Sequence, residues 1–186
     1  MLKKTIILIA ILLMVAPTFA GELKGVKMDD SITVAGKKLV LNGMALRKKF
    51  IFKVYVMGLY LPAKEKSAEK ILKADTERVG VMHWVRSVGT GKINSGWYEG
   101  LEDNTPGYSK ELKKKFDKLS AYMDPVKDGD RIVFTYIPSK GTEVKVKGKV
   151  KGVIEGKDFA DALFACWIGK DPGPGKSFKE DLLGID

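Results

Sequence analysis

The chain has 186 residues, of which 45% are apolar and 30% charged, so its composition is that of an ordinary globular protein and excludes disordered and collagen-like chains. Its net charge is +10, but only four of its 33 basic residues are arginine, and nucleic-acid readout favours arginine, so we expect no nucleic-acid partner. A single Cys and a single His supply too few ligands for zinc, copper, haem or an iron–sulfur cluster, so we expect no metal and no cofactor.

The N-terminal segment has the pattern of a secretory signal peptide. Lys3 and Lys4 form a basic start before the apolar run Ile6–Ala16. Thr18 and Ala20 then occupy the two small positions of a cleavage site. The alternative is an uncleaved membrane anchor, which the length of the apolar run disfavours, since a membrane-spanning helix needs ~20 residues. We therefore expect a signal peptide over residues 1–20 and a single domain over residues 21–186 that is periplasmic or secreted, without stable membrane insertion.

The first part of the expected domain reads as strands. Alternating apolar residues predict strands over Leu23–Met28, Ser31–Val34 and Lys38–Asn42. The β-branched and aromatic run Phe50–Leu61 is too apolar to be half exposed, so it predicts a central strand. Gly58 within this run indicates a bend or a close approach of another segment.

The middle of the chain alternates between the two kinds of element. The patterns predict, in order, a short helix, a strand and two longer helices: Ser67–Ala74, Arg78–Val85, Lys92–Asp103 and Thr105–Met123. Ser67 is expected to cap the first helix. Pro106 is expected in the first turn of the last helix, where its missing N–H costs nothing.

The last third of the domain returns to strands and ends in helices. Turn residues separate three predicted strands, Arg131–Ile137, Glu143–Lys147 and Lys149–Ile154. A helix capped by Asp158 follows and is apolar nearly all round, so it is expected to be buried. Phe178–Leu183 predicts one final helical segment. Strands followed by helices, without βαβ alternation, indicate an α+β fold with a mainly antiparallel sheet.

Common catalytic motifs are missing from the sequence. Gly175-Lys176-Ser177 ends like a phosphate-binding loop, but Lys170 stands where that motif needs a glycine. The sequence contains no Gly-x-Ser-x-Gly elbow, and His83 lies inside an apolar strand, where a core or edge histidine is more common than a general base. Nucleophilic hydrolase chemistry is therefore not expected.

Three segments together resemble the chalcone isomerase superfamily. Residues 41–47 with the following run 50–61 are similar to its arginine-bearing segment and long strand. Residues 157–172 are similar to its C-terminal helix and the loop after it, and residues 97–104 to its helical active-site segment. The expected export matches the bacterial chalcone-isomerase-like branch. The resemblance implies an open-faced β-sandwich, in which a large antiparallel sheet packs against a layer of helices with a ligand cleft between them.

The resemblance also assigns candidate site residues. The arginine with which the enzymes polarise a substrate ketone falls on Arg47, and their asparagine falls on Asn104. Their other three polar positions, a strand threonine, a helix tyrosine and a helix threonine, fall on Tyr55, Trp97 and Cys166. A guanidinium forks onto a ketone, an enolate or a carboxylate, so Arg47 suits an isomerase or a fatty-acid binder. The alternative for Arg47 is a surface arginine beside Lys48 and Lys49.

The superfamily contains enzymes that close a chalcone into a flavanone, non-catalytic relatives and fatty-acid-binding proteins. We expect an exported, non-catalytic binder of a small apolar or amphipathic ligand such as a fatty acid, with Arg47 as the cationic end of an apolar pocket. Further lining residues would be Phe52, Phe164 and Trp167, unless these aromatics only fill the core. One alternative is an isomerase, an intramolecular lyase in which Arg47 is catalytic on an α,β-unsaturated ketone. Another is an exported interaction protein with a vestigial cleft. The sequence leaves the oligomeric state open.

Overall fold

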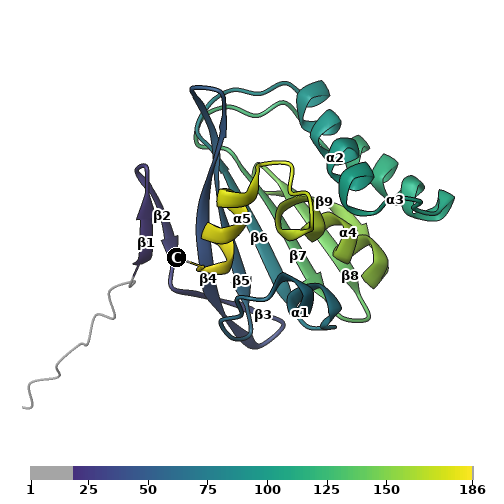
Figure 1. Cartoon of the computed structure of the whole chain (residues 1–186), viewed down its shortest axis with the longest axis horizontal. Helices are drawn as coiled ribbons and strands as arrows, with labels where there is room; N and C mark the ends of the chain where they lie inside the picture. The colour runs from purple at the N-terminus through teal and green to yellow at the C-terminus, as the bar shows by residue number, and fades with distance from the viewer. Residues whose placement is uncertain (1–18, 186) are drawn as a thin grey trace, which may run out of the picture.

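A computed structural model describes residues 19–185, which form nine strands and five helices (Figure 1). Most of the expected signal peptide lies outside the described residues. Seven strands form one antiparallel sheet in chain order: β3 (Ser31–Val34), β4 (Lys37–Lys49), β5 (Phe52–Leu61), β6 (Arg78–Trp84), β7 (Arg131–Ile137), β8 (Gly141–Val146) and β9 (Lys149–Ile154). Such a meander needs no crossover, since each strand pairs with its neighbour in sequence.

Helices cover one face of this sheet: α1 (Ala68–Lys73), α2 (Thr90–Asn104), α3 (Lys110–Ala121), α4 (Lys157–Ile168) and α5 (Lys176–Leu183). The α4 helix packs against the four other helices and β8, which explains why its sequence is apolar nearly all round. Ser67 caps α1 as expected, by accepting a hydrogen bond from the backbone N–H of Lys70. The expected α+β fold, with an antiparallel sheet under a layer of helices, is confirmed.

A small hairpin covers part of the opposite face. It consists of β1 (Phe19–Leu23) and β2 (Val26–Asp29), whose Val26 and Met28 pack on β3–β5. The expected single strand Leu23–Met28 is wrong, because Lys24 and Gly25 take positive φ angles of 55° and 81° and reverse the chain. The close approach expected at Gly58 is confirmed, since a Cβ there would lie 2.2 Å from the Met28 Sδ.

The β4 strand is much longer than the expected Lys38–Asn42. It continues through a bulge after Leu41 to Lys49, and the chain then turns at Phe50 and Ile51 before β5. The buried Asn42 side chain stabilises this bulge by donating to the Leu182 and Glu65 carbonyls and accepting from the Glu65 N–H. These partners lie far away along the chain, so they leave no local sequence pattern.

Two expected helix starts are wrong. Pro106 lies before α3, which begins after Ser109, because Gly107 has a φ of 76° and Ser109 accepts from the Leu112 N–H as the N-cap. Asp158 lies in the first turn of α4, whose N-cap position is Gly156. The Asp158 carboxylate instead binds the Lys115 ammonium of α3, at 2.6 Å and 2.8 Å.

Candidate ligand-binding site

A cavity of about 900 Å³ lies between the helix-covered face of the sheet and helices α2 and α4. This volume is near the upper end for small-molecule sites, which run to ~1,000 Å³. The sheet contributes side chains from β4, β5 and β6, and the 86–89 segment and α2 close the other side. Its apolar and aromatic lining residues include Val54, Met82, Trp84, Ile93, Trp97 and Trp167.

Arg47 and Tyr55 form one wall of the cavity. They face each other directly in the β4–β5 register, and paired residues of an antiparallel ladder extend from the same face of the sheet. Arg47 is half-buried, and among the described residues no carboxylate lies within ion-pair distance of it. Its positive charge is therefore available to a ligand anion.

The Tyr55 hydroxyl is held at its place by a second contact. Trp167 Nε1 donates to the Tyr55 oxygen at 3.0 Å. An indole N–H only donates, so Tyr55 must be the acceptor and its own proton remains free to donate to a ligand. Burial raises the pKa of Tyr55 from 10.0 to about 12, although the Arg47 guanidinium and the Trp167 N–H oppose the rise. The phenol is consequently a proton donor at neutral pH.

Trp97 and Cys166 form the deeper part of the lining. Trp97 lies edge-on to Trp167 with ring centroids 5.6 Å apart. The Cys166 thiol donates to the Ala162 carbonyl, and burial raises its pKa from 9.0 to about 12, which leaves an unreactive thiol. Glycine is needed at Gly100 of α2, because a Cβ there would lie 2.6 Å from Cys166 Sγ.

Asn104, the remaining candidate, lies outside the cavity lining. Its amide donates to the carbonyls of Gly100 and Asp171 and accepts from the Asp171 N–H. These hydrogen bonds connect the end of α2 to the loop after α4. Asn104 thus stabilises elements around the cavity without lining it. The structure thus brings Arg47, Tyr55, Trp97 and Cys166 together.

The three other aromatic residues expected in the lining have different positions. Phe52 and Trp167 line the cavity, whereas Phe164 lies in the core. The Arg78 guanidinium lies 5.1 Å from the centroid of the Phe164 ring. His83 lies on the other face of the sheet, since side chains alternate along β6 and Met82 and Trp84 face the cavity. That alternation, visible in the sequence, was the available signal for Met82 and Trp84.

Charged side chains line the outer part of the cavity, which sequence reasoning missed. Besides Arg47 these are Lys49, Arg86, Lys92, Glu99 and Asp103, all exposed. Arg47 differs from the others in being half-buried and in facing the Tyr55 hydroxyl, so its charge is less screened by water.

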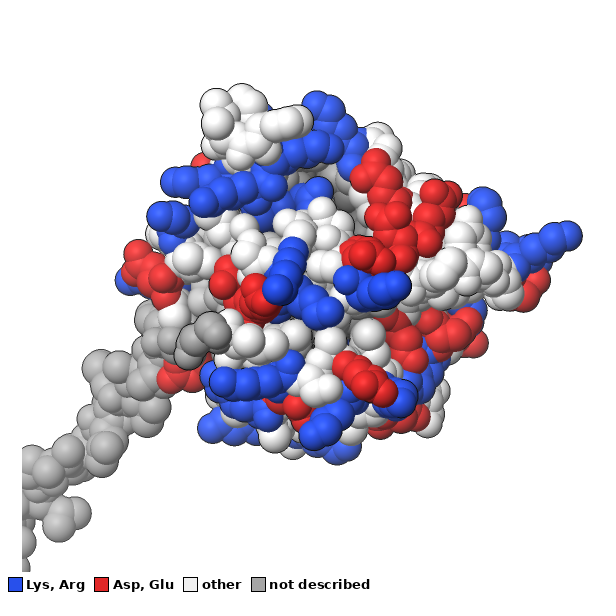
Figure 2. Space-filling model, in the orientation of Figure 1, with Lys and Arg blue, Asp and Glu red and all other residues white. Residues whose placement is uncertain are grey.

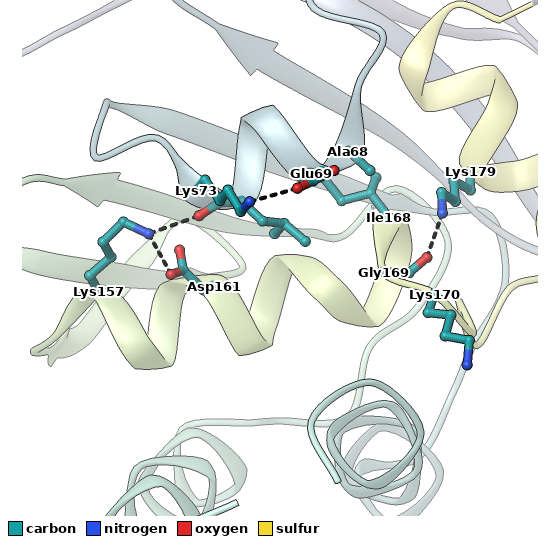
Figure 3. Close-up of a pocket in the computed structure, with 10 residues that line it drawn as sticks. Ala68, Glu69, Lys73, Lys157, Asp161, Ile168, Gly169, Lys170 and Lys179 are labelled. Atoms are coloured by element: carbon teal, nitrogen blue, oxygen red, sulfur yellow. Dashed lines mark hydrogen bonds and ion pairs between the residues drawn. The ribbon is translucent and has the colours of Figure 1, made fainter.

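A second hollow of about 600 Å³ lies between α1, α4 and α5 (Figure 3). Three of its four lysines, all but Lys170, have acceptors within the protein. Lys157 binds Asp161 and the Leu72 carbonyl, Lys73 binds Glu69, and Lys179 donates to the Gly169 carbonyl. These contacts make it a weaker candidate than the Arg47 cavity.

Ionisation of the buried Tyr55 and Cys166 is expected to destabilise the fold in alkali. Unfolding returns their pKa values from about 12 to 10.0 and 9.0, so the unfolded chain loses these protons first. The stabilising contribution is present below pH 9.0 and is lost as the pH rises to about 12. Urea unfolding should show the free energy falling by up to ~1.4 kcal/mol per pH unit for each group.

Cys166→Ala is the matched control, because it removes the thiol. In this variant the free energy of unfolding should no longer fall from pH 9.0. A free energy of unfolding that is constant across this range would contradict the burial of these two groups.

Within residues 19–185, no three His, Cys, Asp or Glu side chains are grouped as metal ligands. None of the helices described is long and apolar enough to cross a bilayer.

Comparisons with known proteins address the fold. The model of a family described as chalcone isomerase-like matches residues 20–184. A solved structure of a fatty-acid binding protein from Arabidopsis thaliana is similar to this chain, with a TM-score of 0.66 and 16% sequence identity. The similarity covers 86% of this chain and 92% of the plant protein. No curated protein sequence matches the chain. The fold expected from the resemblance is confirmed.

Proposed function

The chain belongs to the chalcone isomerase-like family, and from this membership and its cavity we propose that it binds a small amphipathic carboxylate, such as a fatty acid, without catalysing a reaction on it. The family includes proteins of different function, so the choice among these functions depends on the residues of the site.

The observation that carries the proposal is the pairing of Arg47 with Tyr55 on the cavity wall. A carboxylate needs a cation and hydrogen-bond donors, and the Arg47 guanidinium, which has no carboxylate partner among the described residues, and the phenol proton of Tyr55 supply both. Both groups come from adjacent paired strands, so their separation is set by the sheet and not by a mobile loop. The site is thus already arranged for an anionic head group.

The rest of the cavity suits an apolar tail. Its inner walls are made by the side chains of Met82, Trp84, Trp97 and Trp167. Burying a tail here gains roughly 0.8 kcal/mol for each CH₂ group removed from water. A ligand with one carboxylate and a hydrocarbon chain satisfies both parts of the cavity.

Trp97 supports a binding role over an isomerase. It stands where the resemblance places a tyrosine of the enzymes, and an indole can donate a hydrogen bond but cannot accept one. Trp97 therefore cannot accept a hydrogen bond there, as the tyrosine of the enzymes can.

Export is also part of the proposal. Its support is the order of basic residues, apolar run and small residues before Gly21. Cleavage after Ala20 would leave three of the four register pairs of β1 and β2 in place, Gly21 with Met28, Glu22 with Lys27 and Leu23 with Val26. The hairpin on the far face of the sheet would thus be retained.

The test is direct binding to the protein isolated from the exported fraction. Native mass spectrometry is expected to show a co-purified fatty acid and an N-terminus at Gly21. After delipidation, calorimetric titration with saturated fatty acids should give an affinity that rises with chain length until the cavity is filled. The fatty alcohol of equal length should bind more weakly, since it cannot pair with Arg47.

A cavity that takes up no fatty acid would overturn the proposed function. Loss of chalcone absorbance on adding the protein, in place of binding, would support the isomerase instead.

A further inference from the structure

The tip of the β4–β5 hairpin exposes three consecutive large apolar side chains. Phe50 is 88% exposed, Ile51 87% and Phe52 52%. Single exposed apolar residues are common, whereas a contiguous group at a protruding turn marks an interaction site. Figure 1 places this turn at the outer end of the two long strands, away from α1.

Four exposed cations surround this apolar tip and form what we call the cationic collar: Lys48, Lys49, Lys53 and Arg86. Within the part of the chain that the structure describes, none of the four forms an ion pair with a carboxylate. Figure 2 shows the uncharged tip bordered by basic side chains at this edge of the molecule. The collar is therefore an uncompensated positive patch.

The collar is unfavourable within the protein itself. Lys48 and Lys53 face each other directly across the hairpin, and like charges in this position repel. The Arg86 guanidinium lies 4.5 Å from the ring centroid of Phe52, and this attractive contact keeps a further cation beside the apolar tip. An external anionic surface would relieve the repulsion.

We propose that this tip docks the protein on an anionic lipid bilayer, with Phe50 and Ile51 entering the acyl boundary and the cationic collar contacting lipid phosphates. Apolar residues beside lysines and arginines are the chemistry that binds such interfaces. A protein partner fits less well, since a stable interface buries ~800 Å² on each side and this turn is narrow and convex.

The docking surface is continuous with the cavity. Phe50, Phe52 and Lys49 of the hairpin also line it, so their exposed end is its mouth. A bilayer at the tip would therefore meet the opening through which an amphipathic ligand enters. Ligand exchange with the bilayer rests on the proposed function, whereas docking itself does not.

Vesicle binding tests the docking surface. The protein should co-sediment with vesicles of phosphatidylcholine and phosphatidylglycerol, and much less with pure phosphatidylcholine or at high salt. Ile51→Ser should weaken binding roughly tenfold through lost apolar burial. Lys48→Glu, which reverses one charge of the collar, should weaken it by roughly ten- to thirtyfold. Neither side chain lines the cavity.

Matched controls lie at the start of β9. Val150 is 54% exposed and Lys149 is exposed, so Val150→Ser and Lys149→Glu repeat the two changes away from the tip. These controls should bind vesicles like the unchanged protein. Equal losses in control and tip variants, or no preference for anionic vesicles, would overturn the docking surface.

Fatty-acid titration of the same variants in solution separates the two proposals. Retained fatty-acid binding without vesicle binding would overturn docking alone. Vesicle binding through the tip without fatty-acid binding would support docking and overturn the proposed function.

Discussion

Replacing Arg47 by alanine is expected to weaken fatty-acid binding by roughly ten- to a hundredfold, while the free energy of unfolding changes little. A charge-assisted contact shielded from water contributes ~1.5–3 kcal/mol, which corresponds to this range of dissociation constants. The fold should tolerate the change, because among the described residues Arg47 has no ion-pair partner to leave unpaired. Calorimetric titration and urea unfolding of the same preparations measure both effects.

The fatty alcohol of equal length distinguishes recognition of the head group from support of the cavity. Its affinity should change far less than that of the acid, since it brings no carboxylate to Arg47. Arg131→Ala is the matched arginine control, because Arg131 lies on β7 and donates to His83 on the far face of the sheet. Equal losses for acid and alcohol would show that Arg47 shapes the cavity without reading the charge.

Replacing Asp161 by alanine is expected to destabilise the fold by about 3 kcal/mol, the low end for breaking a buried ion pair. Its partner Arg78 is only 1% exposed and is packed between the rings of Tyr136 and Phe164. Besides Asp161, the Arg78 guanidinium donates to the Ile71 carbonyl. Without the carboxylate, a buried cation would remain with one neutral acceptor, which is costly.

Two further variants test this asymmetry in urea unfolding. Arg78→Met should cost less than Asp161→Ala, because it removes the buried charge, and Asp161 keeps Lys157 and contact with water. Asp158→Ala, on the same helix, breaks a more exposed pair with Lys115 and should cost about 1 kcal/mol or less. Similar losses for the two aspartate variants would show that the Arg78 pair is not the buried one.

Elements with a strong local pattern could be predicted closely. The β-branched run before Pro62, the Ser67 cap and the apolar α4 each depend on residues within a few positions of one another. The mainly antiparallel sheet followed from the same patterns, because the strands come in runs without βαβ alternation. These features required no knowledge of distant contacts.

Errors arose where a distant residue satisfies a local group. The length of β4 depends on Asn42, whose partner carbonyl on Leu182 lies 140 residues away in sequence. The start of α4 differs because Lys115 of another helix, 43 residues away, binds Asp158. The turn at Lys24 and Gly25 is the exception, since its positive φ angles belong to a local turn and no distant partner is needed.

The sequence by itself determined the fold class, and through its resemblance to a family it named Arg47, Tyr55, Trp97 and Cys166 as site candidates. Only the tertiary structure decided that these four line one cavity while Asn104 supports it from outside. It also decided that the indole N–H of Trp167 donates to the phenol oxygen of Tyr55, 112 residues away in sequence. The phenol proton of Tyr55 thereby stays free for a ligand. Hydrophobic periodicity specifies which side chains point inward, but which inward faces meet depends on packing of the whole chain.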